Sequence, residues 1–193
     1  MRIFEIIALA LAAALTENLL LGRVLGAGAL VRQKGSLSQC AIAGITVTVI
    51  MAVAAPVCWC ADFFLLRPLG LEYLRLVVFI ALCAVLELVL SALASRIPRL
   101  GEKVNAHIKV SAVNAAVLGV ILLAAQENLR LEECWVQAVF SGAGYALAAV
   151  LLMSVWGRLA FSKWPRAFEG VPIALVTVGL LAMAFLGFTG LQI

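Results

Sequence analysis

The chain has 193 residues, of which 65% are hydrophobic and 12% charged, and its mean hydropathy is +1.16. This composition excludes an ordinary soluble domain, because too few polar side chains are available to cover its surface. The formal net charge of +4 does not indicate nucleic-acid binding, since the basic residues fall in short segments between apolar runs. We therefore expect a single integral membrane domain over residues 1–193.

Six apolar runs are long enough to cross the hydrocarbon core of a bilayer, which takes about 20 helical residues. They lie near residues 3–25, 41–66, 71–94, 110–125, 135–159 and 171–191. We expect each to be helical, because a helix satisfies its own backbone polar groups in lipid. A cleaved signal peptide is the alternative for the first run, since Arg2 precedes an apolar stretch, but Glu5 and the renewed apolar run from Leu19 argue against it.

The first and fourth runs share an element that begins with asparagine and ends with glycine. It reads Asn18-Leu19-Leu20-Leu21-Gly22 and, 96 residues later, Asn114-Ala115-Ala116-Val117-Leu118-Gly119. Three runs begin in each half of the chain, so the two copies are expected to cross the bilayer in opposite directions. The pattern predicts an all-α inverted 3+3 repeat, over about residues 1–96 and 97–193, whose broken first and fourth helices meet at the membrane midplane.

Five residues are expected to shape the two helix breaks, namely Asn18, Gly22, Gly26, Asn114 and Gly119. An asparagine amide can hydrogen-bond the backbone groups that a helix break leaves free. The alternative is that both asparagines join neighbouring helices by ordinary hydrogen bonds.

Small residues are expected where helices touch, because they allow backbones to approach closely in lipid. They include Gly44 and Thr48 in the second run, Gly142 and Gly144 in the fifth, and Gly179 and Gly187 in the sixth. Pro56 is expected to kink the second run, because proline removes a helical hydrogen bond.

Two acidic residues fall within apolar runs, Glu17 beside the first break and Glu87 midway along the third run. A carboxylate in hydrocarbon is costly, and it usually faces a cavity, pairs with a partner or relays ions. We interpret both as candidates for an ion pathway, with a paired or protonated structural acid as the alternative. No set of residues indicates a catalytic or metal site.

Lysine and arginine are concentrated in alternate connections between the runs. Ten of the fourteen lie within residues 23–34, 96–109 and 158–166, and the other four are Arg2, Arg67, Arg75 and Arg130. Because short cytoplasmic loops carry the excess of basic residues, the three basic connections are expected in the cytoplasm and both termini on the outer side.

The five cysteines do not form a metal-binding pattern. Cys58-Trp59-Cys60 has a spacer of one residue, whereas metal knuckles use two to four, so small apolar packing residues are the other interpretation. Cys134 is expected at the same outer depth as Cys58 and Cys60. A disulfide between Cys134 and one of them is therefore a hypothesis.

Several segments of the chain resemble one membrane protein family, in register over nearly the whole length. They are Gly22-Arg23-Val24-Leu25-Gly26 after Asn18, Leu71-Glu72-Tyr73-Leu74-Arg75, Asn114 to Val120, Ile173 to Gly179 and Ala184 to Leu191. On these segments the chain resembles the RnfA/NqrE group of membrane subunits of the Rnf and Na+-NQR complexes.

The resemblance implies a membrane subunit of a complex that couples electron transfer to sodium or proton translocation in the bacterial inner membrane. Such a subunit is not catalytic alone, and it pairs with a homologous six-helix subunit of opposite topology, similar to RnfE/NqrD, among other redox subunits. In that family each half-helix pair carries a cysteine, and the two subunits together hold a 2Fe-2S cluster.

This chain departs from the family at both cysteine positions, which fall on Gly28 and Ala115. No cysteine precedes Cys40, and none lies between Cys83 and Cys134. Because cluster irons need thiolate ligands, we expect no cofactor to be bound by this chain alone. A stand-alone transporter for small solutes or ions, and a structural or assembly subunit without redox function, are the alternatives.

Overall fold

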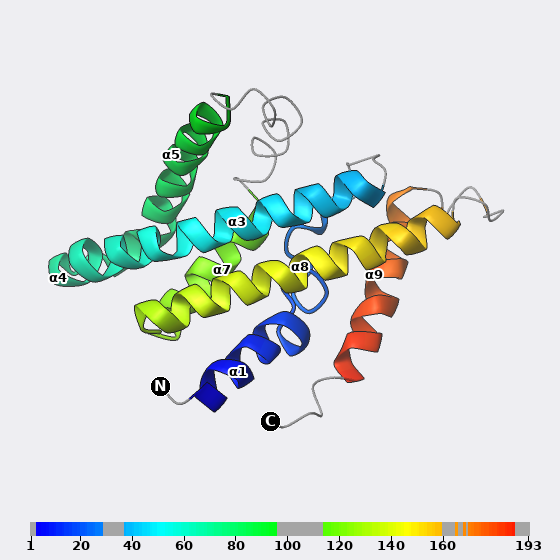
Figure 1. Ribbon diagram of the computed structural model, residues 1–193, viewed down its shortest axis with the longest axis horizontal. Helices are drawn as coiled ribbons and strands as arrows, with labels where there is room; N and C mark the ends of the chain where they lie inside the picture. Colours follow the sequence, from blue (N-terminus) through cyan, green and yellow to red (C-terminus); the bar gives the residue numbers. More distant parts are fainter. Residues whose placement is uncertain are drawn as a thin grey trace.

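The computed structural model describes residues 3–28, 37–95, 114–159, 165, 168 and 170–187. Every regular element within these ranges is helical, as the apolar runs predicted. Two long helices, α3 (Leu37–Ala61) and α8 (Leu131–Leu159), lie side by side along the molecule and make its largest helix contact (Figure 1).

The other elements follow the predicted runs in chain order. They are α1 (Ile3–Leu11) with the π-helix Ala12–Thr16, the π-helix Asp62–Leu66 and α4 (Arg67–Leu69) after α3, a 3-10 turn (Glu72–Leu74), α5 (Arg75–Ser95), α7 (Ala115–Gln126) and α9 (Val171–Leu186). Residues 110–113 and 188–191 of the predicted runs lie outside the described residues.

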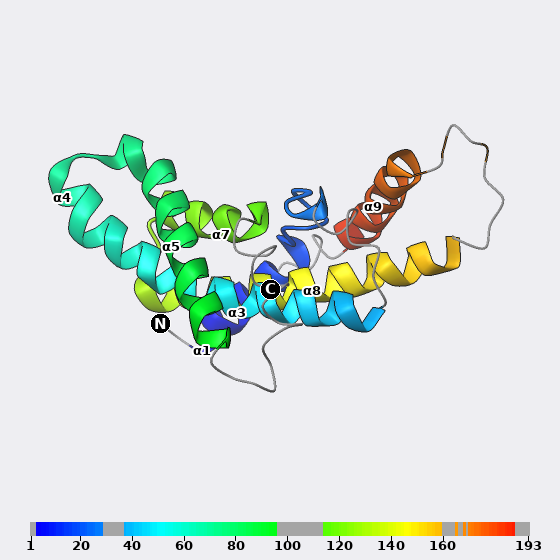
Figure 2. The ribbon, with the colours of Figure 1, turned by 90° about the horizontal axis from the view of Figure 1, so that it is seen from above.

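The shorter helices are arranged around the α3–α8 pair. Figure 2 shows α5 and α7 above one end of this pair and α9 above the other end. The first helix, α1, packs along α8 together with its π-helical extension. The segment that follows this extension lies in the middle of the molecule, between the two groups (Figure 2).

Three helical stretches in the described residues are long and apolar enough to cross a membrane, namely 37–69, 72–93 and 131–159. The second and fifth helices each begin four residues earlier than predicted, at Leu37 and Leu131. The helices α7 and α9 are shorter, and the first helical stretch ends at Thr16. Neither the first nor the fourth predicted run is therefore one straight helix through its full length.

Glycine brings α3 and α8 close together, as predicted. A Cβ atom at Gly44 would lie 2.8 Å from Cβ of Ala146, and one at Gly142 would lie 2.8 Å from Cα of Thr48. The prediction was wrong for Gly179 and Gly187, where an added Cβ would meet nothing within 4 Å in the described structure. α3 runs unbroken through Pro56, and its departure from α-helical geometry comes later, at the π-helix.

Candidate functional site

The first helical stretch ends where Asn18 takes over the backbone hydrogen bonds. The Asn18 side chain is buried, and its Oδ1 accepts hydrogen bonds from the backbone N–H groups of Leu20 (3.0 Å) and Leu21 (3.3 Å). Its Nδ2 donates to the carbonyl oxygen of Ala14 at 3.1 Å. One side chain thus satisfies groups on both sides of the break, which is what buried irregular backbone in a membrane protein requires.

The same amide also attaches the break to α8. Asn18 Nδ2 donates a second hydrogen bond, of 2.8 Å, to the carbonyl oxygen of Gly144. Gly144 has no side chain to obstruct this approach, since a Cβ there would overlap the carbonyl oxygen of Ala14 and lie 2.8 Å from its Cα. The position of the break along α8 is therefore set by backbone contact.

The segment after the break folds back on itself. The backbone N–H of Gly22 donates to the carbonyl of Asn18 (2.7 Å), and that of Leu25 donates to the carbonyl of Leu19 (2.9 Å). Gly26 has a φ of +82°, in the left-handed region that glycine adopts without strain. These bonds hold a compact non-helical segment in the middle of the protein.

The second asparagine is the N-cap residue of α7. Asn114 is in an extended conformation with ψ of 129°, and its Oδ1 accepts from the backbone N–H of Ala116 at 3.1 Å. This is a regular capping bond, which satisfies one of the free N–H groups at the start of a helix. The Asn114 Nδ2 donates to the hydroxyl oxygen of Tyr145 at 3.1 Å.

Tyr145 brings the two halves of the chain into contact. Its hydroxyl donates to the carbonyl oxygen of Gly26 at 3.4 Å while it accepts from Asn114. A Cβ at Gly26 would lie 2.5 Å from Asn114 Oδ1, and one at Gly119 would lie 2.5 Å from Leu25 Cδ1. The segments that follow Asn18 and Asn114 therefore meet, and adjacent residues of α8, Gly144 and Tyr145, bind the two asparagines.

Gly28 and Ala115 are both exposed at this central region. A Cβ added at Gly28 would meet nothing within 4 Å, and Ala115 is the first residue of α7. Neither residue has a thiol, and no group of three or more His, Cys, Asp or Glu side chains in the described part of the chain could hold a metal. The residues present therefore do not fit an iron–sulfur cluster held by this chain.

All five cysteines are free thiols, four of them buried and Cys60 exposed. The Cys134 thiol donates a weak hydrogen bond to the carbonyl oxygen of Ala55, with 3.9 Å between sulfur and oxygen. Cys58 forms a side-chain hydrogen bond with Cys83. The hypothesis of a disulfide between Cys134 and Cys58 or Cys60 was therefore wrong, because the buried thiols have other neighbours.

The two acidic candidates lie on different elements and do not come together. Glu17 is exposed beside the first break, and Glu87 is half-buried on α5, most of which faces away from the rest of the chain. Neither carboxylate makes a hydrogen bond or ion pair with another described residue.

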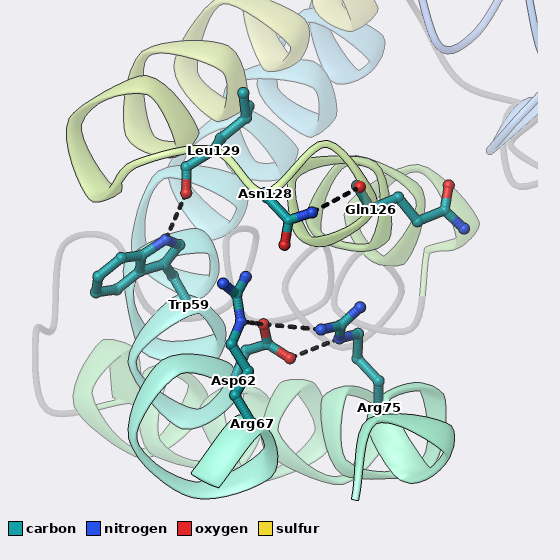
Figure 3. A network of polar contacts seen from close by, with 7 residues as sticks. All are labelled: Trp59, Asp62, Arg67, Arg75, Gln126, Asn128 and Leu129. Atoms are coloured by element: carbon teal, nitrogen blue, oxygen red, sulfur yellow. Dashed lines mark hydrogen bonds and ion pairs between the residues drawn. The ribbon is translucent and has the colours of Figure 1, made fainter. Parts of the chain in front are cut away.

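Sequence reasoning missed a buried carboxylate, Asp62, which holds two arginines (Figure 3). Asp62 is 2% exposed, and it accepts from Arg67 Nε at 2.8 Å and from Arg75 Nε at 2.5 Å. Nearby, Trp59 Nε1 donates to the carbonyl of Leu129 at 2.8 Å. These bonds join the end of α3 to the start of α5 and to the turn before α8. The available signal was an aspartate inside an apolar run with arginine five residues later.

Comparison with known proteins identifies relatives over nearly the full length. The model of the Rnf-Nqr family, described as "Rnf-Nqr subunit, membrane protein", matches residues 6–192. One relative is named as the A component of the Na(+)-translocating ferredoxin:NAD(+) oxidoreductase complex of Acetobacterium woodii. The chain is 34% identical to it over 188 residues, which cover 95% of this chain and 96% of that protein.

Two further relatives are each named as the A component of an ion-translocating oxidoreductase complex. The protein of Glaesserella parasuis is 35% identical over 97% of both chains, and that of Syntrophotalea carbinolica is 33% identical over 93% of both. The resemblance inferred from the motifs is thus confirmed. The chain is a multi-pass integral membrane protein that belongs to the Rnf-Nqr family of membrane subunits.

Proposed function

We propose that this chain is the RnfA-type membrane subunit of an ion-translocating oxidoreductase complex, in which electron transfer drives sodium ions or protons across the bacterial inner membrane. The observation that carries the proposal is the alignment with the A components of such complexes over more than nine-tenths of both chains. In this proposal the chain is not catalytic alone, and it acts through the other subunits of the complex.

The proposed architecture is an inverted repeat with Asn18 and Asn114 as equivalent residues. Each asparagine Oδ1 accepts from the backbone N–H two residues ahead, at 3.0 Å in Leu20 and 3.1 Å in Ala116. This shared local geometry supports the 96-residue offset. The excess of lysine and arginine in alternate connections supports outward termini and cytoplasmic basic loops.

In this proposal the two breaks form the moving centre of the subunit. Asn18, Gly22, Gly26, Asn114 and Gly119 hold the half-helices, and Glu17 and Glu87 lie along the ion pathway. The hydrogen bonds from Asn114 through Tyr145 to Gly26 support the mechanical connection between the repeats, because a shift of one break would displace the partner of the other.

The proposed partners are a homologous six-helix subunit of opposite topology, similar to RnfE/NqrD, and the redox subunits of the complex. This chain contributes no ligand to an iron–sulfur cluster, because Gly28 and Ala115 carry no thiol. Any cluster in this region would need all of its ligands from other chains.

A purely structural or assembly role is the second candidate, and the same two positions favour it. A chain that lost its cluster ligands could keep the fold and its contacts with the complex without taking part in electron transfer. This role predicts that deletion of the chain prevents assembly of the complex, whereas point variants at the breaks leave electron transfer and ion uptake unchanged.

Purification of the tagged chain from its native membrane in mild detergent, followed by mass spectrometry, tests the proposal. We expect a homologous six-span subunit together with flavin or iron–sulfur proteins. Recovery of the chain alone would overturn the assignment to a redox complex and would favour a stand-alone transporter.

A further inference from the structure

Gln137 of α8 is buried without satisfying its side-chain oxygen. Its side chain is 3% exposed, and its Oε1 has no hydrogen-bond partner among the described residues. Buried polar groups are nearly always hydrogen-bonded, and an orphaned one in a native structure calls for a specific explanation, such as an ion or a water that binds there. In a membrane helix such a residue commonly marks a substrate or ion pathway.

Gln137 lies on the face of α8 that carries the two helix breaks. Gln137, Ser141, Gly144 and Tyr145 are separated by four, three and one residues, so they share one side of a helix that turns by about 100° per residue. All four are buried. Gly144 binds Asn18, and Tyr145 binds Asn114. Gln137 and Ser141 therefore extend the polar centre along α8 toward its Leu131 end.

The chemistry of this face suits a metal cation better than a proton. An amide oxygen, a hydroxyl oxygen and backbone carbonyls are hard neutral ligands of the kind that alkali and alkaline-earth cations prefer. Proton relays in membranes use carboxylates and imidazoles, and none of these four residues carries one. The π-helix that ends at Thr16 lies beside Gly144, because Asn18 bonds both segments, and the C-terminal end of a helix attracts cations.

We propose that Gln137 Oε1, with Ser141 Oγ, binds a monovalent alkali cation, of which sodium is the physiological example, as the ion passes between the Leu131 end of α8 and the two helix breaks. This inference rests on the proposed function, since it assumes that the complex translocates an ion. It goes further by assigning the ion-binding oxygens and by favouring sodium over protons.

The test uses the intact complex reconstituted into liposomes, with sodium as the probe. Gln137→Leu keeps the size of the side chain and removes both polar atoms. Loss of a group that binds or orients a metal typically weakens affinity by about 10–100-fold. We expect the sodium concentration for half-maximal electron transfer to rise at least about tenfold, and sodium uptake per electron to fall at subsaturating sodium.

Trp156 provides the matched control, because its buried Nε1 is the other unpartnered side-chain atom on the described part of α8. That atom is a donor and cannot bind a cation, so Trp156→Phe should leave the sodium dependence unchanged. If Gln137→Leu reduces assembly of the complex, Ser141→Ala is measured in its place, and the same rise in the required sodium concentration is expected.

Wild-type sodium dependence in both Gln137→Leu and Ser141→Ala would overturn the inference while the proposed function stands. Uptake of protons alone, independent of sodium, would overturn it in the same way. A wild-type complex that transfers electrons without moving any ion would instead overturn the proposed function, and the inference with it.

Discussion

The side-chain amide of Asn18 donates a 2.8 Å hydrogen bond to the carbonyl oxygen of Gly144, across 126 residues of sequence. Asn18 makes this bond while it also satisfies Ala14, Leu20 and Leu21 at the end of the first helical stretch. The amide therefore has two roles, because it completes the break locally and attaches it to α8.

Replacement of Asn18 by leucine should destabilise the protein, since it leaves buried backbone groups unpaired at about 1–3 kcal/mol each. We expect a lower thermal midpoint of the purified complex and less assembled complex in the membrane. Gln126→Ala is the control, because that side chain is exposed. Equal stability of the two variants would contradict the role of Asn18.

Gly26 and Gly28 offer a matched pair of alanine substitutions in one segment. At Gly26 the backbone has φ of +82°, and an added Cβ would lie 2.5 Å from Asn114 Oδ1, whereas at Gly28 it would meet nothing within 4 Å. Gly26→Ala should therefore lower the thermal midpoint strongly, because it adds both backbone strain and a clash with Asn114. Gly28→Ala should stay close to wild type, and similar losses in both would show that the close approach is unimportant.

Tyr145→Phe removes only the hydroxyl group that links Asn114 to Gly26. Hydrogen bonds between membrane helices contribute about 0.6 kcal/mol on average, so the thermal midpoint should change little. Because the link between the two breaks is lost, ion uptake per electron transferred should fall while electron transfer persists. Tyr73→Phe, at a tyrosine that is 76% exposed, is the control. An unchanged uptake ratio in Tyr145→Phe would argue against coupling through this hydroxyl.

Asp62→Asn should be among the most destabilising single substitutions near the end of α3. Removing one partner of a buried ion pair typically costs about 3–5 kcal/mol, and here Arg67 and Arg75 would both lose their carboxylate. Thermal unfolding of the purified complex measures the effect. Glu72→Gln, at an exposed acid in the same hairpin, should behave as wild type, and equal midpoints for both variants would contradict the prediction.

The apolar runs predicted the helices well, because crossing a bilayer requires long apolar segments whatever the details of the contacts. They misplaced the starts of α3 and α8, since polar residues such as Ser38 and Glu132 continue these helices beyond their apolar parts. The asparagines at the two breaks were identified because an amide followed by glycine is unusual within a membrane span.

The contacts of the centre required the structure. Tyr145 and Gln137 look like ordinary residues of a long helix, and only tertiary packing brings one to Gly26 and leaves the other's side-chain oxygen without a partner among the described residues. Asp62 was missed for a similar reason, because Arg75, one of its two partners, lies thirteen residues away on another helix.

The most direct test of the account is ion uptake driven by electron transfer in membrane vesicles. Vesicles from cells that lack this chain would be compared with vesicles from cells that express the wild-type chain or Asn18→Leu. The account predicts that deletion abolishes uptake of sodium ions or protons, that the wild-type chain restores it, and that Asn18→Leu restores it only in part. Full uptake without the chain would contradict its place in an ion-translocating complex.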